Sequence, residues 1–246
     1  MFISSAFLEI NYGVNDKIAL FFVDREPPVD NLYWKGKLLY LRPAPGYLFI
    51  PLIVDLLYRL GVDRQELLSE QFVKIMEQVG HISALEETRQ ITAEEAIKKS
   101  AELVKDACWD KGWYDNLVNY LYNKNDNFFS GLSVPYKALR RGDLFLFSIC
   151  ALSFEQQLRK KIAEQWFALI GILLLLDDAE DIESDKKTGD ENAFIESGLH
   201  AAGIQKIEEL VNKSLTKIGT LSPAMSLQLK KQYTEFAEKA HQLYSS

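Results

Sequence analysis

The longest apolar run in the chain, WFALIGILLLL at residues 166–176, leads directly into DDAEDIESD at residues 177–185. Six of the nine residues in the second segment are acidic. A membrane-spanning helix needs about 20 apolar residues, so a run of this length indicates a buried helix of a globular protein. Apolar residues recur at spacings of three and four from Phe154 onward, which predicts one helix over about 153–182. The predicted helix therefore passes through a buried interior and bears a set of carboxylates where it reaches the rim.

The acidic segment places three aspartates close together. On a helix, Asp177 and Asp181 are four residues apart and share one face, with Asp178 beside them. Like charges at this spacing repel one another, and acids near a helix C-terminus oppose the helix dipole. A divalent cation reverses both effects, and clustered carboxylates suit Mg²⁺. The segment therefore predicts a Mg²⁺ site; the alternative is a solvated acidic helix end that Lys186 and Lys187 partly neutralise.

Helical patterning also covers most of the chain after residue 47. We expect helices over residues 48–60, 63–80, 112–123 and 204–218, a helix that begins near residue 92, and a last one from Pro223. The expected boundaries are marked by capping-box pairs at Asp63–Glu66, Thr92–Glu95 and Ser153–Gln156, by Gly61, Gly80 and Gly219 at helix ends, and by Ser222 before Pro223.

The first 46 residues have a different pattern. KIALFFVD at residues 17–24 and KLLYLRP at residues 37–43 are short, aromatic and partly β-branched, which is typical of strands or of irregular covering segments. Five of the seven prolines lie within residues 27–51 and interrupt regular structure there. We therefore expect a mostly α-helical, single-domain bundle over residues 1–246, with an irregular or partly β N-terminal segment at residues 1–46.

The composition narrows the classes of partner. The chain has 35 acidic residues against 28 Lys plus Arg, a formal net charge of −7. This balance disfavours nonspecific binding to nucleic acid or to anionic membranes, which needs clustered basic residues. The N-terminus lacks the basic region of a signal peptide, and the two cysteines, Cys108 and Cys150, indicate no disulfide framework. We expect a cytoplasmic protein with no membrane span and no nucleic-acid partner.

The segment LLLLDDAED resembles the second aspartate-rich motif of trans-prenyltransferases, the polyprenyl synthetase family, in which an apolar helix ends in DDxxD. Residues 136–153, YKALRRGDLFLFSICALS, look like the lysine-bearing helix pair of that family, and KKTGD at residues 186–190 looks like its loop after the metal-binding helix. The resemblance covers about residues 120–246. The same acidic residues also fit DxxED, the second acidic motif of squalene and phytoene synthases. Both families share the all-helical isoprenoid synthase fold.

The resemblance implies a function and a set of site residues. Asp177, Asp178 and Asp181 would hold Mg²⁺ against an isoprenoid diphosphate, and Lys137 and Lys187 would bind the diphosphate as point charges. The metal would neutralise the leaving diphosphate as an allylic carbocation forms. The expected activity is Mg²⁺-dependent transfer or condensation of prenyl diphosphates. A homodimer, or a heterodimer with an active synthase, is the expected assembly.

The chain departs from the family pattern at three places. Its N-terminal half contains no DDxxD, and the nearest acids there are Glu86 and Glu87. Leu173 and Leu174 stand where the family has a glutamine, and GKLLYLRP at residues 36–43 only partly matches the family's GKxxRP element. Two alternatives therefore stay open: a catalytically degenerate, prenyl-diphosphate-binding subunit that pairs with an active synthase, and a helical adaptor with no isoprenoid role.

Overall fold

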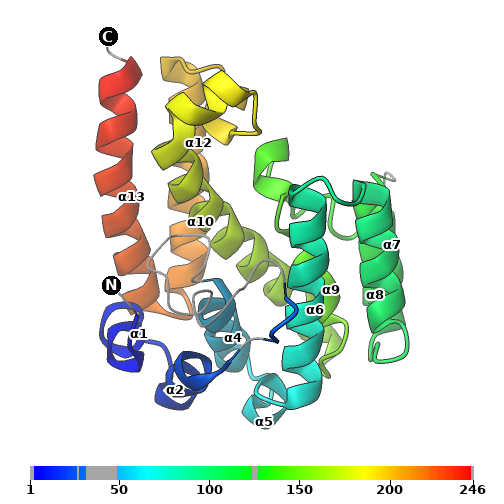
Figure 1. Ribbon diagram of the computed structural model, residues 1–246. Helices are drawn as coiled ribbons and strands as arrows, with labels where there is room; N and C mark the ends of the chain where they lie inside the picture. Colours follow the sequence, from blue (N-terminus) through cyan, green and yellow to red (C-terminus); the bar gives the residue numbers. More distant parts are fainter. Residues whose placement is uncertain (1–2, 27, 32–48, 124–126, 245–246) are drawn as a thin grey trace.

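The structure is a computed structural model in which residues 3–26, 28–31, 49–123 and 127–244 are described. Within these residues every regular element is a helix and none is a strand, which confirms the mostly α prediction (Figure 1). The helices are α1 (Ser5–Tyr12), α2 (Asp16–Asp24), α4 (Phe49–Arg59), α5 (Arg64–Leu67), α6 (Glu70–Glu87), α7 (Ala93–Val104), α8 (Lys111–Leu121), η2 (Lys137–Arg140), η3 (Asp143–Phe145), α9 (Leu146–Ile149), η4 (Gln156–Leu158), α10 (Arg159–Thr188), α11 (Ala193–Glu196), α12 (Ala201–Gly219) and α13 (Pro223–Tyr244).

The central helix is α10, and its first half is enclosed by other helices. Almost all side chains from Ile162 to Leu176 are buried, because a helix that is apolar all round is stable only when its whole circumference is covered. Helices α12 and α13 pack along α10, and α4 crosses it from another side. Figure 1 shows α6 to α9 as a second group of helices, across the molecule from α13. The acidic half of α10 lies beyond the enclosed part.

The expectation of an irregular or partly β N-terminal segment is wrong for residues 5–12 and 16–24, which form α1 and α2. The Asn15 side chain caps α2 by accepting a hydrogen bond from the Lys17 N–H, and Ile18 and Phe22 are buried on one face of the helix. Helical spacing of these apolar residues, together with the cap, overrides the β-branched and aromatic content of the segment. The second candidate strand, residues 37–43, lies outside the described residues.

Most of the predicted helix boundaries are confirmed, including the capping box of Thr92 and Glu95 and the start of α13 at Pro223. Three boundary predictions are wrong. Asp63 does cap a helix, but this helix ends at Leu67, and α6 begins anew after the Ser69 cap. Gly80 does not end a helix, because α6 continues through it to Glu87. Ser153 does not cap a helix, because its backbone N–H and its hydroxyl both donate to the Glu66 carboxylate, at 2.6 Å each.

The two ends of the described chain pack together. Helix α1 lies against α13, and the Tyr12 hydroxyl donates a hydrogen bond to Gln232 Oε1 at 3.0 Å. No helix in the described residues has both the length and the apolar composition needed to span a membrane.

Candidate functional site

A cavity of about 630 Å³ lies between the second half of α6 and the second half of α10. The corner between η2 and η3 closes its third side. Its lining is divided, because apolar side chains occupy one part and carboxylates occupy the other. The apolar part is formed by Phe49, Phe145, Ile170 and Leu174, and the acidic part by Glu86, Glu87, Asp177, Asp181, Asp185, Asp190 and Glu191.

One stripe of α10 contributes to both parts of the cavity. Ile170, Leu174, Asp177, Asp181 and Asp185 all line it, and their spacings of three or four residues place them on a single helix face. Continuous burial around α10 thus ends at Leu176, and the face that lines the cavity continues with carboxylates. The arrangement predicted from the sequence for Asp177 and Asp181, carboxylates at the rim of an apolar interior, is present in the structure.

Electrostatic repulsion is concentrated at Asp177. Its side chain is about half exposed, at 48%. Its pKa is raised to about 6, chiefly by partial burial; the carboxylates of Asp178, Asp181 and Glu87 contribute to the rise, and Arg141 opposes it. Glu87 belongs to α6, so the two acidic walls lie within electrostatic reach of one another. A cation between the walls would relieve this repulsion.

The wall from α6 combines small residues with two glutamates. Gly80 and Ala84 line the cavity without filling it, and Glu86 and Glu87 follow at the end of the helix. Partial burial raises the pKa of Glu86, and the neighbouring Glu87 and Glu191 raise it further. In the sequence, Glu86 and Glu87 are only the nearest acids in an N-terminal half that contains no DDxxD motif. The structure places them in the same cavity as Asp177 and Asp181.

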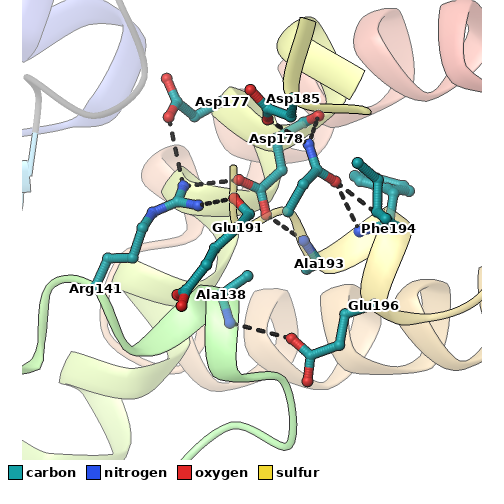
Figure 2. A network of polar contacts seen from close by, with 11 residues as sticks. Ala138, Arg141, Asp177, Asp178, Asp185, Glu191, Ala193, Phe194 and Glu196 are labelled. Atoms are coloured by element: carbon teal, nitrogen blue, oxygen red, sulfur yellow. Dashed lines mark hydrogen bonds and ion pairs between the residues drawn. The ribbon is translucent and has the colours of Figure 1, made fainter. Parts of the chain in front are cut away.

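Arg141 holds the base of the acidic wall, as Figure 2 shows. Its guanidinium donates to Asp178 Oδ1 at 2.7 Å and to the Glu191 carbonyl at 2.7 Å, and its Nη2 lies 3.5 Å from Asp177 Oδ2. The other oxygen of Asp178 accepts a hydrogen bond from the Ala193 N–H at 2.7 Å. Asp178 is only 1% exposed and lies behind the cavity wall. One carboxylate oxygen of Asp178 therefore joins α10 to Arg141, and the other joins α10 to the start of α11.

A second residue braces the same wall from behind. The side-chain amide of Asn192 donates to the Asp178 carbonyl at 2.7 Å and to Asp185 Oδ2 at 2.8 Å. The Asn192 side-chain oxygen also caps α11 by accepting from the Phe194 N–H. Because Asn192 is buried, these hydrogen bonds are shielded from water and hold the loop after α10 against the helix.

The two predicted diphosphate-binding lysines do not line the cavity. Lys137 lies on η2, where its ammonium pairs with the Glu191 carboxylate and its backbone N–H donates to Glu196 Oε1 at 2.9 Å. Lys187 is exposed in the last turn of α10. In the described part of the chain, the cationic side chains that line the cavity are Arg89 and Arg141. Residues 137–149 form short helical turns, η2, η3 and α9, in place of the predicted helix pair.

Arg141 is the residue that the sequence reasoning missed. Its only sequence signal is the adjacent pair Arg140–Arg141 before Gly142, in a segment considered for its lysine. Gly142 follows as part of the cavity wall, and a Cβ there would lie 2.8 Å from Ile170 Cγ1. The close approach of this backbone to α10 brings Arg141 within reach of both Asp177 and Asp178.

The carboxylates of the cavity fit a metal ion only when a bound molecule, such as a phosphate compound, supplies further ligands to the metal. Among the residues that the structure describes, no three His, Cys, Asp or Glu side chains are grouped so that they hold a metal ion by themselves. Mg²⁺ commonly uses one or two carboxylates and takes its remaining ligands from phosphate oxygens and water. Asp177 and Asp181 suit that role because they line the cavity. Asp178 does not suit it, because its oxygens are hydrogen bonded elsewhere.

Comparisons with known proteins assign no family to the chain. No family model matches it, and neither a curated protein nor a solved structure is similar to it.

Proposed function

We propose that the protein binds an isoprenoid diphosphate in the cavity between α6 and α10 with the help of Mg²⁺, as a prenyltransferase-like protein of the isoprenoid synthase type. The observation that carries this proposal is the single face of α10 that changes from Ile170 and Leu174 to Asp177 and Asp181 inside one cavity. A prenyl diphosphate has the same division, with an apolar chain and a highly charged head. A cytoplasmic location belongs to the same proposal.

The charges of the cavity require a cation for this ligand. Among the residues that the structure describes, seven carboxylates and two guanidinium groups line it, and this excess of negative charge would repel a free diphosphate. Mg²⁺ held by Asp177 and Asp181 would reverse the local charge and, when bound, would neutralise a departing diphosphate. Arg141 is placed to add a charge-assisted hydrogen bond to a phosphate oxygen. The prenyl chain would lie against Phe49, Phe145 and the apolar turns of α10.

A second candidate function is a catalytically degenerate subunit that binds the diphosphate and pairs with an active synthase. Two observations favour it. Asp178, which the resemblance assigns to the metal, is bound by Arg141 and Ala193. Leu174 lines the cavity with no hydrogen-bond donor for a diphosphate. With fewer groups to neutralise the leaving charge, the same cavity would bind well and react slowly.

Calorimetric titration of farnesyl diphosphate into the purified chain, with Mg²⁺ and with EDTA, tests the proposal. A diphosphate-release assay on the same samples separates the two candidates. Mg²⁺-dependent binding with release supports the transferase, and Mg²⁺-dependent binding without release supports the degenerate subunit. Farnesol and inorganic diphosphate serve as matched controls, and each is expected to bind more weakly than the intact ligand. Absence of binding to farnesyl, geranyl and geranylgeranyl diphosphates would contradict both candidates and leave the helical adaptor.

A further inference from the structure

The two cysteines of the chain, 42 residues apart in sequence, come together in the fold. Cys108 lies in the loop that follows α7, and Cys150 directly follows α9. Their backbones meet directly, because the N–H of Trp109, the residue next to Cys108, donates to the Cys150 carbonyl at 2.9 Å. Each thiol also lies near enough to the other to shift its pKa. The sequence indicated only that no disulfide framework exists, and it gave no sign of this pairing.

The loop that carries Cys108 is anchored on both sides of the thiol. Helix α7 packs against α9, so the preceding element is fixed relative to Cys150. After the thiol, Asp110 caps α8 through a hydrogen bond from the Trp113 N–H and forms an ion pair with Arg159 of α10. Cys108 and Cys150 are therefore held near one another by packed secondary structure.

The two thiols differ in accessibility and in acidity. Cys108 is half-buried in a surface loop, whereas Cys150 is fully buried. The pKa of Cys108 is lowered to about 7, chiefly because the Cys150 thiol donates a hydrogen bond to its sulfur, and the Asp110 N–H lowers it further. The negative charges of Asp110 and Asp115 oppose this effect. Burial raises the pKa of Cys150, so Cys108 is the nucleophile of the pair and Cys150 remains a thiol.

We propose that Cys108 and Cys150 form a redox-active dithiol that a hydroperoxide converts to an intramolecular disulfide. The Cys108 thiolate attacks one peroxide oxygen, the O–O bond breaks, and sulfenic acid forms on Cys108 with release of hydroxide or alkoxide. The Cys150 sulfur then attacks the Cys108 sulfur. The S–O bond breaks, and the hydroxyl leaves as water with the Cys150 proton. Two thiols are oxidised by two electrons, and one hydroperoxide is reduced.

This reaction needs little movement of the chain. A disulfide requires the sulfurs to approach to about 2 Å, and thiols on two segments that a backbone hydrogen bond joins can meet by side-chain rotation. The bond would join the loop after α7 to the end of α9. The inference does not depend on the proposed function, because neither cysteine lines the cavity.

Mass spectrometry of the folded chain after treatment with hydrogen peroxide tests the proposal. We expect the two peptides containing Cys108 and Cys150 to be joined by a bond that a reductant reverses, and both thiols to become unreactive toward iodoacetamide. The Cys150→Ser variant should accumulate sulfenic acid on Cys108, which dimedone traps, whereas Cys108→Ser should remain reduced. If the wild-type chain keeps both thiols alkylatable while it stays folded, or forms only intermolecular disulfides, the proposal is wrong.

The pH dependence of alkylation gives a second readout that does not require the oxidised form. In the folded wild-type chain, the alkylation rate of Cys108 should have its midpoint near pH 7. In Cys150→Ala, which lacks the hydrogen-bond donor, we expect the midpoint to move upward by about one pH unit, toward the ordinary thiol value of about 8.5. Thermal melts establish that each variant is folded. A midpoint near 8.5 in the wild-type chain would overturn the assignment of Cys108 as the nucleophile.

Discussion

The two acidic walls of the cavity are built differently. The wall from α10 consists of aspartates on successive turns of a helix whose preceding turns are buried. Arg141 and Asn192 brace it from behind through hydrogen bonds to Asp178 and Asp185. The wall from α6 consists of glutamates in the last turn of that helix, where the helix dipole disfavours negative charge. Among the described residues, the hydrogen bonds of Arg141 and Asn192 fix the far side of the first wall, and no comparable side-chain bond holds Glu86 or Glu87.

This difference indicates how much each wall would contribute to the affinity for a cation. Short aspartate side chains on a braced helix lose little conformational entropy when they hold a cation, so the α10 wall is preorganised. The longer glutamates Glu86 and Glu87 would lose more rotamer freedom on binding. We therefore expect the α10 wall to supply most of the affinity for Mg²⁺ and the α6 wall to adjust to the bound ligand.

The largest effect is expected from removing the carboxylates of the α10 wall. Asp177→Ala with Asp181→Ala should weaken Mg²⁺-dependent binding of farnesyl diphosphate by roughly 100-fold or more, about 2.7 kcal/mol. Glu86→Gln with Glu87→Gln should weaken it by less than roughly 10-fold, about 1.4 kcal/mol. Calorimetric titration measures both. Equal losses in the two double variants would show that the walls do not differ in this way.

A matched control comes from the same helix. Glu180 and Glu183 are exposed acids of α10 that do not line the cavity, so Glu180→Ala with Glu183→Ala should leave binding unchanged. Thermal melts accompany each titration. The variant without Asp177 and Asp181 should unfold at the same temperature as wild type or higher, because it loses like-charge repulsion. A large fall in its unfolding temperature would assign these aspartates a structural role.

The brace behind the α10 wall can be tested separately. Arg141→Ala leaves Asp178 buried without its counter-ion, which should lower the free energy of unfolding by about 2 kcal/mol, less than for a fully buried pair because Arg141 is partly exposed. Chemical denaturation measures the change. Arg89→Ala is the control, since the ion pair of Arg89 with Asp190 is exposed and its loss should cost at most about 0.5 kcal/mol. Similar effects in the two variants would contradict the bracing role.

The contrast between the walls also marks what the sequence can reveal. The apolar run that leads into Asp177 and Asp181 predicts both the buried helix and its acidic rim, because burial and helical period act on neighbouring residues. Whether Asp178 faces the cavity or is bound behind its wall depends on Arg141, which is 37 residues away in sequence. The meeting of Glu86 and Glu87 with α10 depends equally on tertiary packing. The signals that determine α2 are local: the Asn15 cap and the helical spacing of Ile18 and Phe22 outweigh the aromatic and β-branched content of the segment.

The smallest expected effect is a dependence on pH, which arises from the ionisation of Asp177 in the α10 wall. The pKa of Asp177 is raised from an ordinary value near 3.8 to about 6, chiefly by partial burial. Between these two values the folded state binds more protons than the unfolded state, so the free energy of unfolding should fall as pH rises through this window.

Mg²⁺ requires the ionised carboxylate, so metal-dependent affinity should rise by up to about tenfold from pH 5 to pH 7. Titrations at several pH values measure this, and Asp177→Asn should remove most of the pH dependence while Asp185→Asn should keep it. An unchanged pH profile in Asp177→Asn would mean that another group, such as Glu86, controls the ionisation of the cavity.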